Sequence, residues 1–272
     1  MKIAISNIAW PDTEEHSVAA RLGALGAQGV EIAPTKRWGR PAEAAALEAE
    51  EYRNWWSARG LPVVALQSLL YGRNDLVIFG DDSVRAETAT YLERIIDLAA
   101  HLGATNLVFG SPLNRQVGSL DRKTIERLAV PFFTRVGAYA HSLGINFCIE
   151  PNPPQYKCDW LIDTRECVAF LELVGVAGLA LHLDAAALSL NAEPLEPTFA
   201  LAAPWLRHFH ASEPYLAPVA GGAASHAKFA AALRTVGYGG WVSIEMRPVE
   251  DARATLAHVA EALEFVRAVY GG

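Results

Sequence analysis

Four short apolar runs in the second half of the chain each end in an ionisable residue. The runs read Phe-Cys-Ile-Glu150, Leu-His-Leu-Asp184, His-Phe-His210 and Val-Ser-Ile-Glu245. Three carboxylates and one imidazole form a hard, oxygen-rich ligand set that suits Mn²⁺ or Mg²⁺, and Co²⁺ or Zn²⁺ also fits. Such side chains repel one another when they share a poorly solvated site, so a cation must neutralise them. The pattern therefore predicts a site for one divalent metal ion.

The alternative for each of these residues is an ion pair with a lysine or arginine of a surface loop. That alternative is the better explanation for a single carboxylate or imidazole at the end of an apolar run. Four such residues at the same height on neighbouring elements are better explained by metal binding, because a shared acidic cluster needs a cation.

The four runs belong to a pattern of eight β-branched segments separated by helical segments. The predicted strands are Lys2–Ser6, Gly29–Ala33, Pro62–Ser68, Thr105–Gly110, Ile145–Glu150, Leu179–Asp184, Leu206–Ala211 and Trp241–Glu245. Strands that alternate with helices pair in parallel, because each parallel connection needs a crossover. Eight such units predict an α/β fold, a single-domain (β/α)₈ TIM barrel over residues 1–272. The carboxyl ends of its strands would converge on one mouth, where active sites are built.

Several signals mark the ends of the predicted helices. Glycines follow five of them: Gly26, Gly60, Gly103, Gly144 and Gly237. A glycine in this place takes the left-handed conformation that closes a helix. Asp82 and Ser83 are the candidate N-cap of the helix before the fourth strand. Pro131 lies within the next helical pattern, which predicts a kink there or a helix that starts later than Asp121.

Side-chain alternation along the strands supports a common inward direction for the four predicted ligands. If the ligands point into the barrel, the residues two positions earlier do so as well: Cys148, His182, His208 and Ser243. The intervening residues then face the helices, and all are apolar: Ile149, Leu183, Phe209 and Ile244. The lower polar layer is of the kind that orients metal ligands.

Further blocks of sequence are distinctive. They are Ile-Ser-Asn-Ile-Ala-Trp10, Val30-Glu31, Leu98-Ala-Ala-His-Leu-Gly-Ala-Thr-Asn-Leu-Val108, Glu150-Pro-Asn152, Leu183-Asp184, His208-Phe-His210-Ala-Ser-Glu213 and Gly237-Tyr-Gly-Gly-Trp-Val-Ser-Ile-Glu245. On these blocks the chain resembles the sugar (phosphate) isomerase/epimerase superfamily of xylose-isomerase-like TIM barrels, and the resemblance covers nearly the whole chain.

The resemblance implies that Glu150, Asp184, His210 and Glu245 bind the metal and that the two glutamates also move protons. The implied reaction is isomerisation or epimerisation of a small keto-sugar, sugar phosphate or related polyhydroxy carbonyl compound. It would pass through a cis-enediolate that the metal stabilises. Two alternatives stay open: a metal-dependent dehydratase (lyase) of a cyclic keto-polyol, and a non-catalytic sugar-binding barrel.

The chain departs from the ketose 3-epimerases of this superfamily at three places. Tyr156 stands where they carry a glutamate, and Ala187 stands where they carry a histidine. The segment Glu213-Pro-Tyr-Leu216 replaces a stretch that holds an arginine. Three groups that fix a free ketose are therefore replaced, so 3-epimerisation of a free ketose does not follow from the resemblance.

Eight residues expected near the mouth are candidates for binding substrate: Asn7, Trp10, Glu31, Gln67, Asn152, Tyr156, Glu213 and Arg247. Glu31 could equally form an ion pair at the rim. Trp10 could equally be a packing residue rather than one that stacks on a sugar face. Arg247 shares the inward direction of Glu245 and could hold an anionic group of the substrate.

Charge and composition limit the remaining partners. The formal net charge of −7 argues against nucleic acid. The sequence has no apolar run of the roughly 18 residues that a membrane span needs, and no signal-peptide pattern follows its first residue. We therefore expect a small-molecule carbohydrate substrate, no nucleic-acid or membrane partner and a cytoplasmic location. A homo-oligomer is expected only by analogy with similar barrels.

Overall fold

Eight parallel strands close into a barrel in a computed structural model that describes residues 1–271. They are β1 (Lys2–Ser6), β2 (Gly29–Ile32), β3 (Val63–Leu66), β4 (Asn106–Phe109), β5 (Asn146–Ile149), β6 (Leu179–Asp184), β7 (Leu206–Ser212) and β8 (Trp241–Glu245). Each strand pairs with the next, and β8 pairs with β1 to complete the ring. The predicted TIM barrel is confirmed, and the predicted domain limit at Gly272 lies outside the described residues.

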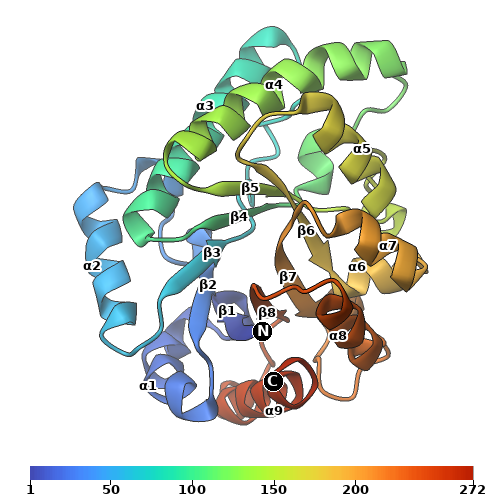
Figure 1. The fold of residues 1–272 in the computed structure, drawn as a ribbon. Helices are drawn as coiled ribbons and strands as arrows, with labels where there is room; N and C mark the ends of the chain where they lie inside the picture. Colours follow the sequence, from blue (N-terminus) through green and yellow to red (C-terminus); the bar gives the residue numbers. More distant parts are fainter. Residues whose placement is uncertain (272) are drawn as a thin grey trace.

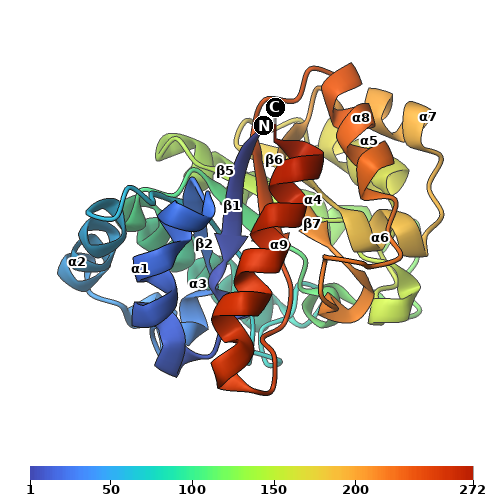
Figure 2. The same ribbon diagram turned by 90° about the horizontal axis from the view of Figure 1, so that it is seen from below.

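Helices surround the strands on all sides (Figure 1). They are α1 (Glu15–Leu25), α2 (Ala46–Ser57), α3 (Asp82–Leu102), α4 (Arg122–Ser142), α5 (Thr164–Val174), α6 (Ala185–Leu190), α7 (Leu195–Ala202), α8 (His226–Thr235) and α9 (Thr255–Tyr270). The last helix returns to the first, because α9 packs against both α1 and β1 (Figure 2). Short 3₁₀ turns at 112–115, 154–156 and 214–216 follow β4, β5 and β7.

The helix ends follow the predicted signals with two corrections. All five predicted glycines adopt a positive φ, between 70° and 93°. The predicted cap of α3 is wrong by one residue, because Asp81 caps the helix by accepting a hydrogen bond from the Val84 N–H at 2.9 Å. The predicted late start of α4 is also wrong: Asp121 caps it, and the helix continues through Pro131. A proline there costs one backbone hydrogen bond, which the rest of a long helix tolerates.

The two faces of the strands separate polar from apolar side chains. The predicted outward residues Ile149, Leu183, Phe209 and Ile244 are all buried in the main hydrophobic core. The inward layer of Cys148, His182, His208 and Ser243 is also fully buried. The interior of this barrel therefore contains polar groups stacked beneath the mouth, as the alternation predicts.

The register differs among the strands that carry the four predicted ligands. It pairs Ile149 with Leu181, Asp184 with His210, and Glu245 with Ser212. Glu150, the residue after β5, therefore lies opposite His182 in the register rather than opposite Asp184. The strands of a closed barrel are tilted and staggered, so partners in the register do not lie at one height along the barrel axis. The common height of the four ligands therefore stays a prediction.

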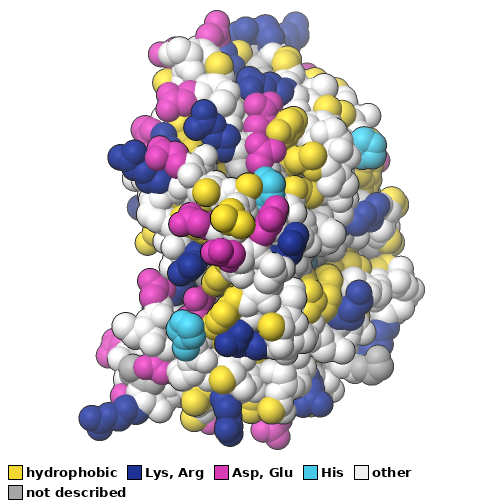
Figure 3. Space-filling view, turned by 90° about the vertical axis from the view of Figure 1, so that its left-hand side faces the viewer, with side chains coloured by type: hydrophobic (Ala, Val, Ile, Leu, Met, Phe, Trp, Pro, Cys, Tyr) yellow, Lys and Arg dark blue, Asp and Glu magenta, His cyan; other side chains and the backbone are white. Residues whose placement is uncertain are grey.

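The outer surface carries charges of both signs. On the side that bears α2, basic and acidic side chains are interspersed (Figure 3). Several of them pair, as Arg73 does with Asp75 at 2.6 Å and Arg135 with Glu93 at 2.6 Å. Within residues 1–271, none of the helices combines the length and apolar character that crossing a membrane requires.

Candidate metal centre

Asp184 is held rigidly where β6 turns into α6. It caps that helix by accepting a hydrogen bond from the Ala187 N–H at 2.7 Å through Oδ1. Its other oxygen, Oδ2, accepts a hydrogen bond from the hydroxyl of Ser212 on the neighbouring strand. Ser212 in turn accepts a hydrogen bond from the Ala186 N–H at 3.1 Å. These contacts fix the orientation of a carboxylate that is almost fully buried.

His210 lies between two carboxylates, one facing each ring nitrogen. Its Nε2 is 2.9 Å from the Glu31 carboxylate, and its Nδ1 is 3.3 Å from Oε2 of Glu245. The Nδ1 contact does not have hydrogen-bond geometry, so this buried nitrogen has no hydrogen-bond partner among the residues that the structure describes. Glu31 therefore sets the ring direction and presents Nδ1 toward the mouth.

Glu150 extends into the mouth from the end of β5. Its carboxylate lies 3.9 Å from Nε2 of His182, and its side chain is 15% exposed. Gly110 at the end of β4 makes room for it, because a Cβ at that position would lie only 2.2 Å from Oε2 of Glu150. Arg115 supports the backbone behind it by donating a hydrogen bond to the Glu150 carbonyl oxygen at 2.7 Å.

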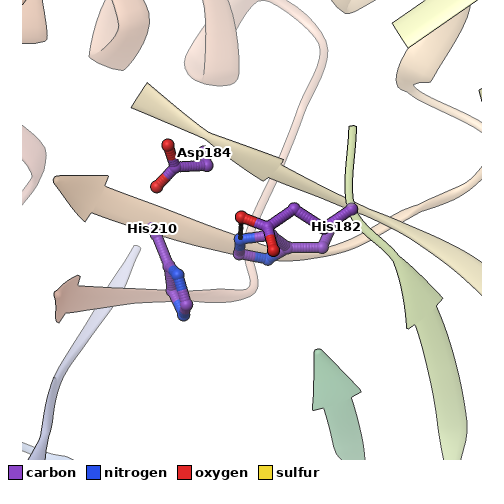
Figure 4. A group of neighbouring side chains, drawn as sticks. His182, Asp184 and His210 are labelled. Atoms are coloured by element: carbon purple, nitrogen blue, oxygen red, sulfur yellow. Dashed lines mark ion pairs between the residues drawn. The ribbon is translucent and has the colours of Figure 1, made fainter. Parts of the chain in front are cut away.

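The structure brings three of the four predicted ligands into one tight group and adds a fourth member. Donor atoms of Glu150, His182, Asp184 and His210 all lie within 4.8 Å of one another. Figure 4 shows the three labelled side chains converging from β6 and β7, and its dashed line marks the pair between His182 and Glu150. Glu245 is outside this group, but its carboxylate reaches His210 and its side chain is 16% exposed.

A second polar group supports the first from below. Glu31, His208 and His210 also place donor atoms within 4.8 Å of one another, and all three are fully or almost fully buried. Glu31 lies 3.5 Å from Nε2 of His208 as well as against His210. A carboxylate on the far nitrogen of a metal-binding histidine is the usual outer contact of such a ligand. Glu31 therefore occupies a supporting position rather than a place in the mouth.

Electrostatics make this cluster costly without a cation. Burial, together with the negative charges of Asp184 and Glu245, raises the pKa of Glu150 to about 8. Burial and Glu245 likewise raise the pKa of Asp184 to about 6. Although burial alone would lower it, the carboxylates of Glu31 and Glu245 raise the pKa of His210 well above its usual range. The site accommodates its own charges poorly, which is the condition that a bound cation relieves.

The donor set fits a divalent metal. Glu150, Asp184, Glu245 and Nδ1 of His210 offer three carboxylates and one nitrogen that lacks a hydrogen-bond partner. His182 is a further donor, because burial and the neighbouring imidazoles hold its pKa well below the usual value and keep the ring neutral. The assignment of the four ligands remains a prediction. The donor types that a divalent metal needs are present among these residues.

Replacement of Glu31 by glutamine tests its supporting role. We expect Glu31→Gln to weaken Mn²⁺ binding by about 10- to 100-fold, because His210 loses the charged partner that orients and polarises it. Equilibrium dialysis of the metal measures the change. The control is Glu50→Gln, which alters another carboxylate facing an imidazole, that of the partly exposed His101 at 3.3 Å. Equal affinities in the two variants would refute the role of Glu31.

The raised pKa of Glu150 predicts how pH affects the metal-free protein. Between the ordinary value of 4.5 and the folded value of about 8, the folded protein holds a proton that the unfolded chain has lost. Stability contributed by this group therefore falls as pH rises through that range. Urea unfolding at pH 5, 6.5 and 8 should show Glu150→Gln gaining stability relative to the metal-free parent as pH rises. A difference independent of pH would contradict the assigned environment.

A cavity of about 440 Å³ opens above the cluster. Its lining includes Glu150, Asp184 and Glu245, together with four of the predicted substrate-binding residues: Gln67, Asn152, Tyr156 and Glu213. A cavity of this size is in the range that small ligands use. The predicted substrate contacts of these four residues remain predictions, and their position at the mouth supports them.

The other four substrate-binding candidates lie outside this cavity lining. Asn7 is buried and accepts a hydrogen bond from the Ala33 N–H at 2.8 Å, so it braces the start of the first two loops. Trp10 is fully buried and packs against Trp56, which agrees with the packing alternative. Glu31 lies beneath the ligands, and Arg247 is exposed outside the lining.

Glu213 has a structural task in addition to its place at the mouth. Its carboxylate accepts hydrogen bonds from the Ala223 and Ala224 N–H groups at 3.0 Å and lies 3.0 Å from Nε2 of His226. Gly222 permits this approach, because a Cβ there would lie 2.1 Å from the Glu213 carboxylate. These contacts of Glu213 therefore stabilise the conformation of the loop between β7 and α8.

The sequence interpretation missed two functional candidates, and only the first carried a usable signal. Ser212 continues the inward alternation of His208 and His210, so it could have been assigned as the partner of Asp184. Tyr215 lines the cavity but lies in a 3₁₀ turn, where alternation no longer predicts direction.

Solved structures of similar fold include several sugar epimerases. A D-psicose 3-epimerase determined in the presence of D-fructose has a TM-score of 0.82 at 22% identity, with 100% of each chain covered. The 3-keto-D-glucoside 4-epimerase YcjR from E. coli has a TM-score of 0.78 at 18% identity, covering 98% of this chain and 99% of its own. The IOLI protein with a bound zinc atom has a TM-score of 0.78 at 16% identity, covering 99% and 98% respectively.

At these identities the likeness establishes the fold alone. A search of curated protein sequences gave no match. The sequence of residues 19–269 nevertheless matches one family over most of the chain. On that match, and with the closed barrel described above, the protein belongs to the xylose isomerase-like TIM barrel family.

Proposed function

We propose that this protein is a divalent-metal-dependent isomerase or epimerase of a small polyhydroxylated carbonyl compound. The observation that carries the proposal is the convergence of Glu150, Asp184 and His210, with Glu245 beside them, at the barrel mouth, where the three carboxylates line the cavity. The epimerases of the same fold act on sugars by their names, and one structure of this fold contains a bound zinc atom, which supports a role for a metal. Mn²⁺ and Mg²⁺ suit the oxygen-rich donors best.

The metal would be held by Glu150, Asp184, His210 and Glu245. When bound, it would supply Lewis-acid polarisation of a substrate carbonyl and lower the energy of the enediolate. Asp184 would act only as a ligand, because its two oxygens are already oriented by Ala187 and Ser212. The partly exposed carboxylates of Glu150 and Glu245 are left to reach the substrate.

These two glutamates would move the protons. One carboxylate takes a proton from the carbon beside the carbonyl, and the other returns a proton to the same or the adjacent carbon. Return to the opposite face of the same carbon gives an epimer, whereas return to the neighbouring carbon gives an isomer. In the metal-free protein the pKa of Glu150 is raised to about 8, and a bound cation would lower it and favour the carboxylate form that accepts a proton.

Solvent deuterium exchange tests this proposal. The Mn²⁺-loaded protein is incubated in D₂O with a panel of keto-sugars and keto-polyols, and products are analysed by NMR and mass spectrometry. We expect deuterium at the carbon beside the carbonyl, and a product whose mass differs from that of the substrate only by the label. We expect no exchange after the metal is removed. Loss of one water would support a dehydratase instead. Absence of any metal-dependent exchange, while sugars still bind, would refute both enzymes and favour a binding protein.

A further inference from the structure

We propose that the substrate of this site is an uncharged, ring-closed keto-sugar or keto-polyol whose apolar face rests on Tyr156 and Tyr215. This inference rests on the proposed function and narrows its substrate class. It excludes sugar phosphates and open-chain ketoses as the preferred ligands. Three features of the cavity carry it: the sign of its charges, an aromatic corner at its rim and the apolar residues in its lining.

The charges of the cavity are all negative. Among the described residues that line it, the charged ones are Glu150, Asp184, Glu213 and Glu245, and neither lysine nor arginine contributes to the lining. A single divalent cation would neutralise only two of the negative charges of these four carboxylates. A phosphate or carboxylate on the substrate would therefore meet acidic groups without a cationic partner, which strongly disfavours binding.

The basic residues near the barrel mouth do not line the cavity and so do not offer a charge to an anion there. Arg115 is fully buried, and its guanidinium donates to the Glu150 carbonyl oxygen at 2.7 Å from behind the wall. Arg247 and Lys157 are exposed and lie outside the lining. Anion recognition usually employs an arginine aimed at the ligand, and none is so placed here among the residues around the cavity.

The aromatic corner joins the loops that follow β5 and β7. The rings of Tyr156 and Tyr215 meet edge to face with centroids 5.7 Å apart, and the Tyr215 N–H donates to the Tyr156 hydroxyl at 3.1 Å. Tyr215 is 63% exposed and has a φ of 61°, in the left-handed region that bulky residues avoid. A large exposed ring held in a strained backbone at a cavity rim indicates a ligand contact.

Apolar residues also contribute to the cavity lining. They are Val108, Pro112, Ala186 and Leu216. An open-chain ketose has a polar group on every carbon, and hydroxyls facing these apolar residues would lose hydrogen bonds to water without replacement. A closed ring gathers its C–H groups on one face and its polar groups at the edge. That shape can place the ring face on the tyrosines while the carbonyl and a hydroxyl reach the carboxylates.

Calorimetric titration of the Mg²⁺-loaded protein with three unreactive or weakly reactive probes tests the inference. The probes are methyl α-D-glucopyranoside, glucose 6-phosphate and D-glucitol, which differ in charge and ring closure. We expect the neutral ring to bind on the order of tenfold more tightly than the phosphate, because of charge repulsion. We expect a similar margin over the open chain, because of its ordering cost. Failure of the neutral ring to bind, or tighter binding of either other probe, would overturn the proposal.

Variants of Tyr215 provide the matched control. We expect Tyr215→Ala to weaken binding of methyl α-D-glucopyranoside by about three- to tenfold, whereas Tyr215→Phe, which keeps the ring, retains most of the affinity. Equal affinity in both variants and the parent would contradict the stacking role. Because these probes have no ketone, the result is independent of turnover. Preference for the neutral ring without deuterium exchange would support the substrate inference and reject the proposed reaction. Deuterium exchange without preference for the neutral ring would support the reaction and reject the substrate inference.

Discussion

Glu150→Gln should lower metal-dependent proton exchange by about 10²- to 10⁴-fold, the usual contribution of a general acid or base. Glutamine has nearly the same shape but cannot accept the proton from carbon. Glu150 lines the cavity and its side chain is 15% exposed, so its carboxylate can reach a bound substrate. The rate of deuterium incorporation at saturating Mn²⁺ measures the effect, so weaker metal binding cannot account for it.

The matched control for this change is Glu264→Gln, an exposed residue of α9. We expect that variant to exchange at the rate of the parent protein. If Glu150→Gln also keeps its rate within a factor of about two while retaining metal, Glu150 does not transfer the proton. In that case Glu245, which shares the cavity, would have to act without it.

Metal binding should stabilise the folded protein strongly. At a Mn²⁺ concentration of about 100 times the dissociation constant, the free energy of unfolding should increase by about 2.7 kcal/mol. For a chain of this size the gain corresponds to a rise in Tm of roughly 5 to 10 °C. Asp184→Asn should lose most of this gain, because it removes the ligand that Ser212 and the Ala187 N–H orient. Thermal unfolding with and without Mn²⁺ measures both proteins.

A fully exposed aspartate provides the comparison for this experiment. Asp82 lies at the start of α3 and pairs only with Arg85 on the surface, so Asp82→Asn should keep the full metal-induced rise. If Asp184→Asn shows the same rise as Asp82→Asn, the ion that stabilises the protein is bound elsewhere. The proposed centre would then have to be abandoned.

The sequence was sufficient to predict the barrel and the inward layer. Strand and helix lengths predict a closed parallel sheet, and alternation correctly separates His182 and His208 from Leu183 and Phe209. These features depend on local periodicity and on burial, which the residue pattern records directly. The same alternation, carried two residues further on β7, would also have identified Ser212.

The register between the strands and the place of Glu31 could not be predicted in the same way. Both depend on the stagger between strands, which arises from closing the sheet and not from the pattern within a strand. The register of β5 and β6 brings Glu150 opposite His182, and the carboxylate of Glu31 contacts His210. Similarly, the strand-end pattern that suggested Trp10 as a sugar contact does not reveal its burial against Trp56.

The structure shows where the departures from the ketose 3-epimerase pattern lie relative to the cavity. Tyr156 and the segment that contains Tyr215 replace charged groups, and the cavity shows that these replacements meet at one corner. Ala187 lies outside the cavity lining, although its neighbour Ala186 contributes to it. Two of the three replacements therefore meet in the cavity, and the third does not line it.

Counting bound metal decides whether the four strands share an ion. Metal-free protein is dialysed against Mn²⁺, and the bound ion is measured by elemental analysis in the parent and in His210→Gln. Because the donors converge on one point, we predict one Mn²⁺ ion per chain in the parent protein. In His210→Gln we predict that the dissociation constant of Mn²⁺ rises by at least 10- to 100-fold, on the order expected for loss of ligand support. A parent protein that binds no Mn²⁺, Mg²⁺, Co²⁺ or Zn²⁺, or a variant that binds as the parent does, would contradict the account.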